Sequence, residues 1–304
     1  MKRPNSILLY LLIGLSTCIV ILSLLSLIHD LKFWYFKILD FPRLQYLLFA
    51  VIFLILFLII NKKWKFSSAF LVLGLLASIF IQGKVILPYY IGSKTVPDAG
   101  NGASNKGRSV GILIANVLIT NRNSEKYIDI VREANPDMVL AMEVNKWWVE
   151  QLQVFKNEFP YTMILPLDNA YGMALYSKYP LKNQEVMFLN KDNVPSFYAE
   201  VLLKSGESFS FFGVHPVAPV PSGKYPDNQG EKEVALLKVG EMVVNQKLPV
   251  VVAGDFNDVS WSHTSRLFEG TGALKNVRIG RGLYNTFDAN SSFLRWPLDH
   301  FFVT

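Results

Sequence analysis

Five polar residues stand directly after apolar stretches of this sequence: Asn116, Glu143, His215, Asp255 and Asn257. Carboxylate and amide oxygens are ligands that Mg²⁺ accepts in proteins. Histidine and aspartate can move protons or orient a water molecule, and asparagine can donate to an anionic oxygen without adding charge. A set of these residue types suits chemistry on phosphate groups, provided that the fold brings its members together.

Each of the five also has an explanation that involves no chemistry. Asparagine and aspartate favour turns after a strand, and Glu143 could be a carboxylate placed at a helix N-terminus. His215, which precedes Pro216, could be a loop histidine bonded to the backbone. As a set, however, they predict a cation held by few protein oxygens, which leaves positions for a phosphate oxygen and for water. The expected ion is Mg²⁺ or Mn²⁺, which acts as Lewis acid and template.

The apolar stretches in front of these residues predict strands. Residues 250–253 are all apolar, which is typical of a strand buried on both faces. Residues 110–116 and 138–143 have the same character, and residues 197–203 and 208–214 predict a hairpin. Because open α/β sheets bind their ligands at the carboxyl ends of strands, we expect the polar residues that follow to lie together.

Helices and one further strand are predicted between these segments. Ser124 predicts the N-cap of a helix that extends to residue 133. Residues 231–244 form an amphipathic pattern that predicts a second helix. Ser262 predicts the cap of another short helix, and residues 172–180 predict a strand followed by a turn. The sequence thus alternates strands and helices from residue 110 onward.

The first third of the chain is much more apolar than the rest. The protein has 304 residues, 51% of them hydrophobic, and the excess is concentrated in residues 6–29, 44–60 and 67–91. Each stretch approaches the length of about 20 apolar residues that crosses a bilayer. We therefore predict a membrane region at residues 1–91 with three transmembrane helices, rather than core helices. A signal peptide is disfavoured, since the first stretch is long and no small-residue cleavage site follows it.

Positive charge is concentrated in the same region. Residues 1–104 carry 10 Lys and Arg against 3 Asp and Glu, whereas residues 105–304 carry 20 against 21, which together give the net charge of +6. The nearly neutral C-terminal part weakens the case for a nucleic-acid partner. The single cysteine, Cys18, excludes an internal disulfide framework and a cysteine-based metal site.

Basic residues beside the apolar stretches predict the orientation. Lys2 and Arg3 precede the first stretch, and residues 61–65 contain three lysines after the second. Cytoplasmic loops are enriched in Lys and Arg, so both groups are expected in the cytoplasm, although basic residues in the first loop weaken this bias. We thus predict a multi-pass protein of the cell membrane, with residues 92–109 as a flexible linker and residues 110–304 as an extracytoplasmic domain.

Six segments resemble the endonuclease/exonuclease/phosphatase superfamily in sequence, order and spacing. They are Ile114-Ala-Asn-Val117, Pro136-Asp-Met-Val-Leu-Ala-Met-Glu143, Gly172-Met-Ala-Leu-Tyr-Ser-Lys-Tyr-Pro-Leu181, Phe211-Phe-Gly-Val-His-Pro216, Val251-Val-Ala-Gly-Asp-Phe-Asn-Asp258 and Pro297-Leu-Asp-His-Phe-Phe-Val303. With its membrane region and the Trp261-Ser-His-Thr segment, the chain resembles a bacterial membrane-anchored branch. The resemblance covers residues 108–304 and implies an α+β domain, a four-layer α/β sandwich of two packed sheets flanked by helices, here preceded by the three transmembrane helices.

The resemblance also implies metal-dependent cleavage of phosphoesters and a role for each polar residue. Glu143 would be the main metal ligand, with Asn116 beside the metal and the substrate phosphate. Asp255 would position the attacking water, and Asn257 would contact the scissile phosphate. His215 would form a hydrogen bond with a phosphate oxygen.

The chain departs from the superfamily pattern at two places. Some members carry Asp two residues after the first-strand Asn, where this chain has Leu118. Members also end on a Ser-Asp-His-x-Pro segment, which supplies a metal-side Asp and the essential His. Asp299-His300 is followed by apolar residues without that proline, so it resembles the preceding strand, whose Asp299 would orient the catalytic histidine. The domain at residues 110–304 is therefore expected to be C-terminally incomplete.

Two functions remain as hypotheses. The first is a membrane-anchored, divalent-metal-dependent phosphodiesterase or phosphatase-type hydrolase, in which metal-activated water attacks a phosphoester. The second is a non-catalytic phosphate-binding or membrane interaction module, which the expected absence of the terminal Asp-His motif would favour. The expected partners are the lipid bilayer and a phosphoester substrate, either a lipid headgroup or a nucleic acid. No feature of the sequence indicates a protein partner.

Overall fold

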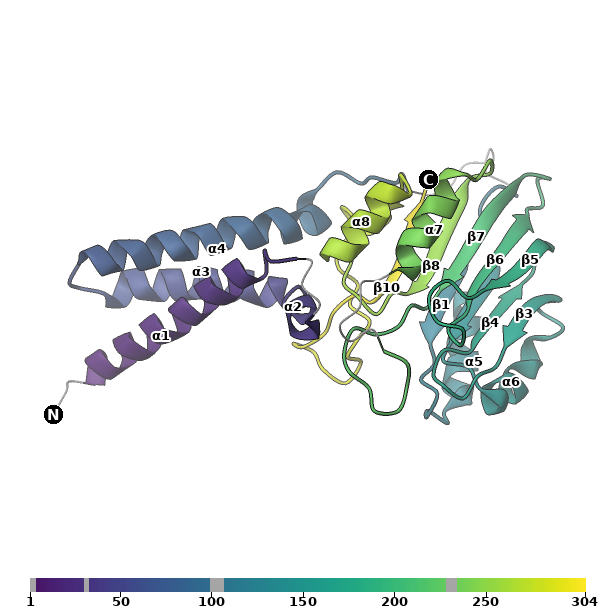
Figure 1. Cartoon of the computed structure of the whole chain (residues 1–304), viewed down its shortest axis with the longest axis horizontal. Helices are drawn as coiled ribbons and strands as arrows, with labels where there is room; N and C mark the ends of the chain where they lie inside the picture. Colours follow the sequence, from purple (N-terminus) through teal and green to yellow (C-terminus); the bar gives the residue numbers. More distant parts are fainter. Residues whose placement is uncertain (1–3, 30–32, 99–106, 228–233) are drawn as a thin grey trace.

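The computed structural model describes residues 4–29, 33–98, 107–227 and 234–304. It shows a helical arm joined to a sandwich of sheets and helices (Figure 1). The arm comes from the N-terminal third of the chain, and the sandwich comes from the remainder. The candidate site residues all belong to the sandwich.

The arm contains three long helices and a short one. They are α1 (Pro4–Leu25), α2 (Trp34–Ile38), α3 (Arg43–Ile60) and α4 (Phe66–Ile91). Over the described residues, α1, α3 and α4 are long and apolar enough to cross a membrane. They meet along a seam that contains Ile19, Ala50 and Leu75, while many of their other apolar side chains are exposed. Helices that are apolar all round are typical of membrane spans. The short helix α2 was not predicted.

A buried polar cluster joins the three long helices at the end next to the sandwich. Arg43 donates to Asp40 Oδ1 at 2.7 Å, to Gln82 Oε1 at 3.0 Å and to the backbone oxygen of Ser26 at 2.6 Å. Gln82 in turn donates to Ser26 Oγ at 3.1 Å. Because a buried charge requires a partner, this cluster explains why polar residues interrupt otherwise apolar helices. It also ties together segments that are distant in sequence.

The first sheet of the sandwich has four strands. In order across the sheet they are β1 (Ile112–Asn116), β2 (Met138–Met142), β4 (Met173–Ser177) and β3 (Tyr161–Leu165). β1 and β2 are parallel, and the other pairs are antiparallel. One face is covered by α5 (Ser124–Ala134), α6 (Lys146–Gln151) and a 3₁₀ helix (Leu152–Phe155). These helices bury Val131, Trp148 and Phe155 against the sheet.

The second sheet has six strands. In order they are β5 (Leu181–Met187), β6 (Ser196–Leu202), β7 (Ser208–Val214), β8 (Val250–Asp255), β10 (Asp299–Val303) and β9 (Lys275–Asn276). β7 and β8 are parallel, whereas β8 and β10 are antiparallel. One face is covered by α7 (Ala235–Val244) and α8 (His263–Thr271). They bury Leu236, Val239 and Phe268 against it.

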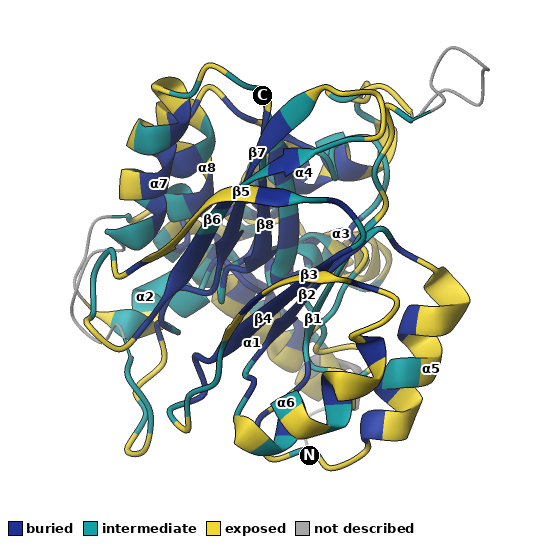
Figure 2. Ribbon diagram, turned by 90° about the vertical axis from the view of Figure 1, so that its right-hand side faces the viewer, coloured by how far each residue is buried: buried dark blue, intermediate teal, exposed yellow. Residues whose placement is uncertain are grey.

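The two sheets pack face to face around a shared apolar core. Leu140 and Leu175 of the first sheet belong to one buried cluster with Phe197, Phe211 and Ala253 of the second. The helices on the outer faces complete four layers, with the buried strands in the middle (Figure 2). This architecture confirms the predicted four-layer α/β sandwich preceded by three long apolar helices.

Some predicted elements differ from the structure in detail. Asn123 rather than Ser124 caps α5, since its side chain accepts from Lys126 N at 3.2 Å. Ser262 caps α8 as predicted, accepting from Ser265 N at 3.0 Å. The edge strands β3 and β5 were not predicted. The exposed middle of β5 is polar, so no apolar strand pattern arises there. β3 is apolar at four of its five positions, but so short a run does not distinguish a strand from a segment of helix.

Two predicted segments are only partly described. The start of the predicted linker contacts the sandwich: Thr95 donates to the backbone oxygen of Asn276 at 2.7 Å, and Arg281 donates to that of Val96 at 2.6 Å. Residues 99–106 of the linker lie outside the described residues. Residues 231–233, the start of the helix predicted at residues 231–244, also lie outside the described residues. The rest of that prediction corresponds to α7.

Candidate functional site

Asn116 joins the acidic residues of the two sheets. It ends β1, and its Nδ2 donates to Glu143 Oε1 at 2.7 Å and to Asp255 Oδ2 at 3.1 Å. Glu143 follows β2 of the first sheet, whereas Asp255 ends β8 of the second. The structure therefore brings together three of the residues that the sequence predicts as a site.

Glu143 is held by the tight turn that follows β2. Its backbone is left-handed, with φ of 62°, and its Oε2 accepts from the backbone N–H of Ile119 at 3.0 Å. Gly172 is required here, because a Cβ at that position would lie 1.9 Å from the backbone oxygen of Val144. Each oxygen of the carboxylate accepts a hydrogen bond from the protein, and each keeps a lone pair for a further ligand.

Asp255 is buried at the end of β8, where Gly254 allows close approach to β7. A Cβ on Gly254 would lie 1.8 Å from the backbone oxygen of Val214. Asp255 Oδ1 accepts from the backbone N–H of Asn257 at 2.9 Å. Burial raises the pKa of the Asp255 carboxyl, while the hydrogen bonds from Asn116 and Asn257 oppose that shift. The carboxylate is thus oriented by two neutral donors.

His215 and Asn257 both lie beside Asp255. His215 is 2% exposed, and its Nε2 lies 4.0 Å from Asp255 Oδ2. Burial lowers the pKa of His215, which favours a neutral imidazole. Among the described residues its Nδ1 has no hydrogen-bond partner. Asn257 Nδ2 donates to the backbone oxygen of Pro216 at 2.9 Å, which holds the loop after β7 against the end of β8.

Asp299 lies next to Asp255, whereas His300 does not face the site. Asp299 and Asp255 are directly opposite each other in the antiparallel β8–β10 pair. Burial raises the pKa of Asp299, and the charge of Asp255 raises it further. Asp299 Oδ1 has no partner in the described part of the chain. The ring of His300 is turned elsewhere, with Nε2 donating to the backbone oxygen of Asp258 at 2.8 Å.

Comparison with known proteins identifies the family. The model of the Endonuclease/Exonuclease/phosphatase family matches residues 113–304, which contain every site residue described above. The chain belongs to this family. No curated protein matches the chain. The bacterial membrane-anchored branch within the family stays a prediction.

Solved structures of this fold are distant in sequence. Beta toxin from Staphylococcus aureus is 17% identical with a TM-score of 0.50, over 64% of this chain and 85% of that chain. Sphingomyelinase C from Streptomyces griseocarneus is 14% identical with a TM-score of 0.50, over 64% and 83%. An endonuclease/exonuclease/phosphatase family protein from Bacteroides thetaiotaomicron is 18% identical with a TM-score of 0.48, over 64% and 82%. For beta toxin and sphingomyelinase C, the likeness at these identities concerns the fold alone.

The donor atoms of the cluster of Glu143, Asn116 and Asp255 suit a divalent cation that has few protein ligands. Glu143 offers a lone pair on each oxygen. Asn116 turns its amide nitrogen toward the carboxylates, while its Oδ1 accepts from Leu118 N at 2.9 Å, so Glu143 is better placed as a ligand than Asn116. Over the described residues, no group of three or more His, Cys, Asp and Glu could hold a metal. Such a donor set matches Mg²⁺, which often binds through one or two carboxylates, water and phosphate.

Tyr171 supports the candidate site, although it was not predicted from the sequence. Its ring lies 4.9 Å from that of His215. Its hydroxyl donates to the backbone oxygen of Pro226 at 2.9 Å and accepts from Ala218 N at 3.2 Å. Tyr171 thereby holds the loop after β7 beside the site. A local signal was that Tyr171 directly precedes Gly172. Its contacts could not be predicted, because Pro226, Ala218 and His215 lie far along the chain.

Proposed function

We propose that this chain is a membrane-anchored phosphoester hydrolase that works with a divalent metal ion, Mg²⁺ or Mn²⁺. The observation that supports it most is the hydrogen-bonded cluster of Glu143, Asn116 and Asp255, which spans both sheets. The cluster lies in a chain whose family is named for nucleases and phosphatases. In the proposed reaction, water attacks the phosphorus atom and the ester oxygen leaves.

Glu143 would hold the metal ion, with Asn116 bracing its carboxylate. When bound, the ion supplies Lewis-acid polarisation of a phosphate oxygen and neutralises charge. Asp255 orients the attacking water and accepts its proton. Asn257 uses one amide hydrogen on Pro216 and keeps the second for a phosphate oxygen.

His215 and Asp299 act at the edges of the same cluster. The buried imidazole of His215 offers a nitrogen without a partner among the described residues, which suits a hydrogen bond to a phosphate oxygen. Asp299, next to Asp255, has a free carboxyl oxygen in the described part of the chain. That oxygen would orient a histidine or a water molecule beside Asp255.

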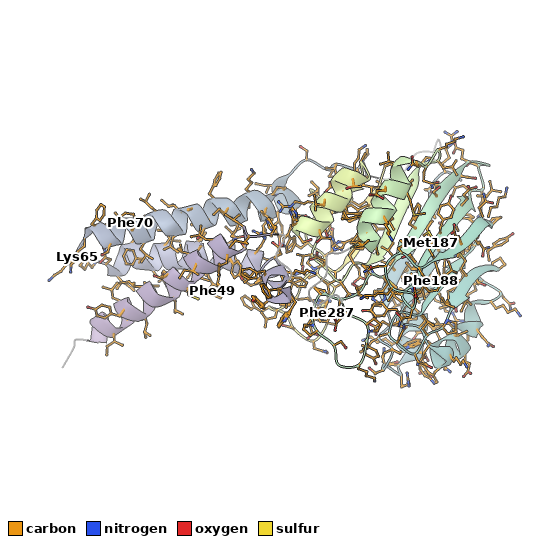
Figure 3. All side chains as sticks on the ribbon, in the orientation of Figure 1. Phe49, Lys65, Phe70, Met187, Phe188 and Phe287 are labelled. Carbon is orange, nitrogen blue, oxygen red and sulfur yellow. The ribbon has the colours of Figure 1, made fainter. Side chains whose placement is uncertain are left out.

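The helices α1, α3 and α4 would anchor the domain in the cell membrane. Three lysines follow α3, namely Lys62, Lys63 and Lys65. Figure 3 labels Lys65, which lies at the end of the arm that is far from the sandwich. Arg43, at the near end, is buried and paired with Asp40 at 2.5 Å, so it is not a free basic residue of a loop. These positions support a cytoplasmic far end and an extracytoplasmic sandwich.

A lipid headgroup is the substrate class that we favour over nucleic acid. The anchor holds the domain at a bilayer, and the part of the chain after residue 104 is nearly neutral in charge. A dedicated nucleic-acid enzyme usually presents a basic surface to phosphates. The name of one neighbour in fold, sphingomyelinase C, suggests sphingomyelin as a first lipid to test.

Hydrolysis by the purified full chain tests the proposal. The probes are bis(p-nitrophenyl) phosphate as a diester and p-nitrophenyl phosphate as a monoester, each with Mg²⁺, Mn²⁺ or a chelator. We expect metal-dependent turnover that falls about 100-fold or more in Glu143→Gln and in Asp255→Asn. Glu207→Gln, which changes an exposed carboxylate in the β6–β7 turn, is the matched control. Equal turnover in all four proteins would rule the proposal out.

A second candidate function is phosphate binding without turnover. It is favoured because the histidines other than His215 have contacts elsewhere. The ring of His300 bonds to the backbone oxygen of Asp258, and His29 stacks on His263 at a ring distance of 4.6 Å. This candidate predicts calorimetric binding of a non-hydrolysable phosphonate that is lost in Glu143→Gln. It also predicts no hydrolysis of either probe by the wild-type chain, so any metal-dependent turnover would exclude it.

A further inference from the structure

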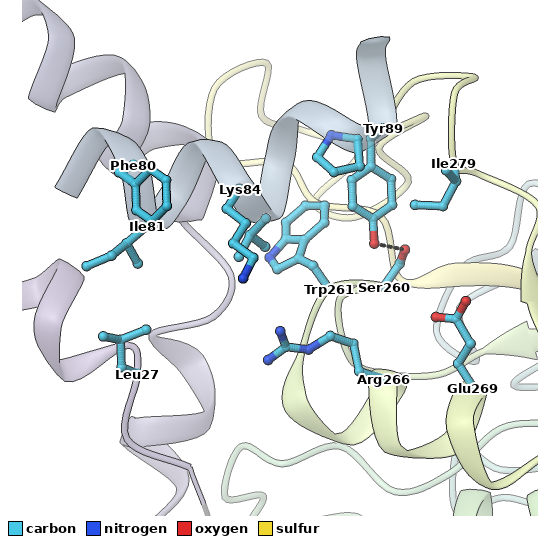
Figure 4. A pocket seen from close by; sticks show the side chains of 12 residues that line it. Leu27, Phe80, Ile81, Lys84, Tyr89, Ser260, Trp261, Arg266, Glu269 and Ile279 are labelled. Atoms are coloured by element: carbon cyan, nitrogen blue, oxygen red, sulfur yellow. Dashed lines mark hydrogen bonds between the residues drawn. The ribbon is translucent and has the colours of Figure 1, made fainter. Parts of the chain in front are cut away.

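A pocket of about 470 Å³ lies where the helical arm meets the sandwich (Figure 4). Leu27, Phe80 and Ile81 form an apolar wall on the arm. Lys84 of α4 and Arg266 of α8 approach the same space from opposite sides (Figure 4). The pocket therefore combines an apolar wall with two cationic side chains from different parts of the molecule. It shares no lining residue with the candidate catalytic cluster.

The two cations of the pocket are available to a ligand. Within the residues that the structure describes, neither Lys84 nor Arg266 uses its side chain in a hydrogen bond or an ion pair. Glu269 of α8 also lines the pocket, and in the view of Figure 4 it lies farther from Lys84 than Arg266 does. Burial raises the pKa of Glu269, and a backbone hydrogen bond from Asn276 opposes that shift. The end of the pocket that holds Lys84 and Arg266 is thus positively charged.

An apolar groove continues from this end along α4. It has a volume of about 710 Å³ and shares Phe80, Lys84 and Pro88 with the pocket. From there it extends over Ile79 and Ile91 on the surface of the helix. The surface of a membrane span faces acyl chains, so the groove leads from the hydrocarbon region to the two cations.

The pocket also has the residue types of a membrane surface. Tyr89 and Trp261 line it, and such aromatic residues are enriched at the level of lipid headgroups. Lys84 lies seven residues before Ile91, the end of α4, which corresponds to about 10 Å along the helix axis. A lysine at that depth can extend its ammonium group to the headgroup level.

Contacts between the arm and the sandwich lie at the pocket and close to it in sequence. Ser260 Oγ donates to Tyr89 Oη at 3.1 Å, and the ring of His29 stacks on that of His263. The first contact links the loop after β8 to α4, and the second links the residues after α1 to the start of α8. A ligand in the pocket would contact both the arm and the sandwich.

We infer that this pocket binds one anionic phospholipid from the bilayer leaflet next to the sandwich. The headgroup phosphate lies between Lys84 and Arg266, and an acyl chain occupies the groove along α4. The inference rests on the membrane anchoring in the proposed function, but not on hydrolysis. A net negative headgroup matches two cations, whereas a zwitterionic headgroup brings a cation of its own. The bound lipid contacts Trp261 and so stabilises the loop that follows Asp255 and Asn257.

Native mass spectrometry of the full chain, released from nanodiscs with equal amounts of phosphatidylglycerol and phosphatidylcholine, tests this site. We expect the wild-type chain to retain one phosphatidylglycerol in preference to phosphatidylcholine. The double variant Lys84→Gln/Arg266→Gln should lose that preference about 30-fold, equivalent to about 2 kcal/mol for two cations near a lipid surface. Lys62→Gln/Lys63→Gln, which changes two exposed lysines at the far end of the arm, should keep it. Lys84→Arg should keep it as well.

Three results would overturn the inference: equal retention of both lipids by the wild-type chain, an unchanged preference in Lys84→Gln/Arg266→Gln, or displacement of the lipid by inorganic phosphate. Carbonate extraction and diester hydrolysis of the same preparations separate this inference from the proposed function. A chain that stays in the membrane but shows no lipid preference refutes the lipid site alone. A chain that carbonate extracts refutes the anchoring, and a chain without turnover refutes the hydrolase.

Discussion

At the scale of single residues, Asn116 accounts for the geometry of the candidate site. Its amide bonds to Glu143 and Asp255 on different sheets and places a neutral donor between two carboxylates. The presence of all three residues at strand ends could be predicted from the sequence, because apolar runs stop there. Their bonds could not, since those depend on how the two sheets face each other.

We expect Asn116→Asp to lower diester turnover by about 100-fold. The substitution replaces the bridging donor with a third acid next to Glu143 and Asp255, and like charges at that distance raise one another's pKa. Steady-state hydrolysis of bis(p-nitrophenyl) phosphate measures the effect. Asn245→Asp, on an exposed residue at the end of α7, should behave as the wild type. A fully active Asn116→Asp would show that the bridge has no part in the reaction.

Asp258 should make stability depend on pH. Its Oδ2 accepts from Ser262 Oγ at 2.6 Å, and burial raises its pKa to about 7. The unfolded value is about 3.9, so the folded chain binds the additional proton between these values. Its contribution to stability is complete below about pH 4 and is lost as the pH rises through about 7.

Thermal unfolding of the full chain in detergent measures this dependence between about pH 5 and 8. Asp258→Asn keeps the shape of the side chain and removes the titrating group, so its melting temperature should vary less over that range. An equal slope in both proteins would contradict the role given to Asp258.

At the scale of elements, the parallel pair of β7 and β8 positions the second half of the site. Gly254 lets the two strands approach so closely that Asp255 emerges beside His215. The strand at β8 could be predicted because it is apolar throughout. The edge strands β3 and β5 could not, because the exposed middle of β5 is polar and the apolar run at β3 is too short to distinguish a strand from a segment of helix.

Gly254→Ala should destabilise the chain by about 3 kcal/mol, because its Cβ would overlap the backbone oxygen of Val214. Gly270→Ala is the matched control: nothing lies within 4 Å of its Cβ position in α8, so a gain of about 0.5 to 1 kcal/mol is expected. Denaturant unfolding followed by tryptophan fluorescence compares the two. A Gly254→Ala protein as stable as the wild type would refute the close approach of β7 and β8.

At the scale of the whole molecule, the chain is a helical arm with a sandwich at one end (Figure 1). Length and apolarity predicted the arm, and six short segments predicted the family of the sandwich. The junction was not predictable: Trp261 Nε1 donates to the backbone oxygen of Asp40 at 2.7 Å, a contact between residues that no local pattern relates. For the same reason the sequence did not show that Arg43 is buried and paired.

The lysines at the far end of the arm predict that the sandwich lies on the extracytoplasmic side of the membrane. An alkaline phosphatase reporter fused after Thr304 should be active, because that enzyme requires an extracytoplasmic location. The same reporter fused after Lys63, in the loop between α3 and α4, should be inactive. The reverse pattern would place the sandwich in the cytoplasm and contradict the orientation.

The central claim is that Glu143 and Asp255 act as parts of one catalytic site. A double-mutant cycle on kcat/KM for metal-dependent diester hydrolysis tests it most directly, with the wild type, Glu143→Gln, Asp255→Asn and the double variant. Residues that act as a unit are strongly non-additive. We predict that the double variant loses about as much activity as either single variant. Losses that multiply independently, or single variants as active as the wild type, would contradict a shared site.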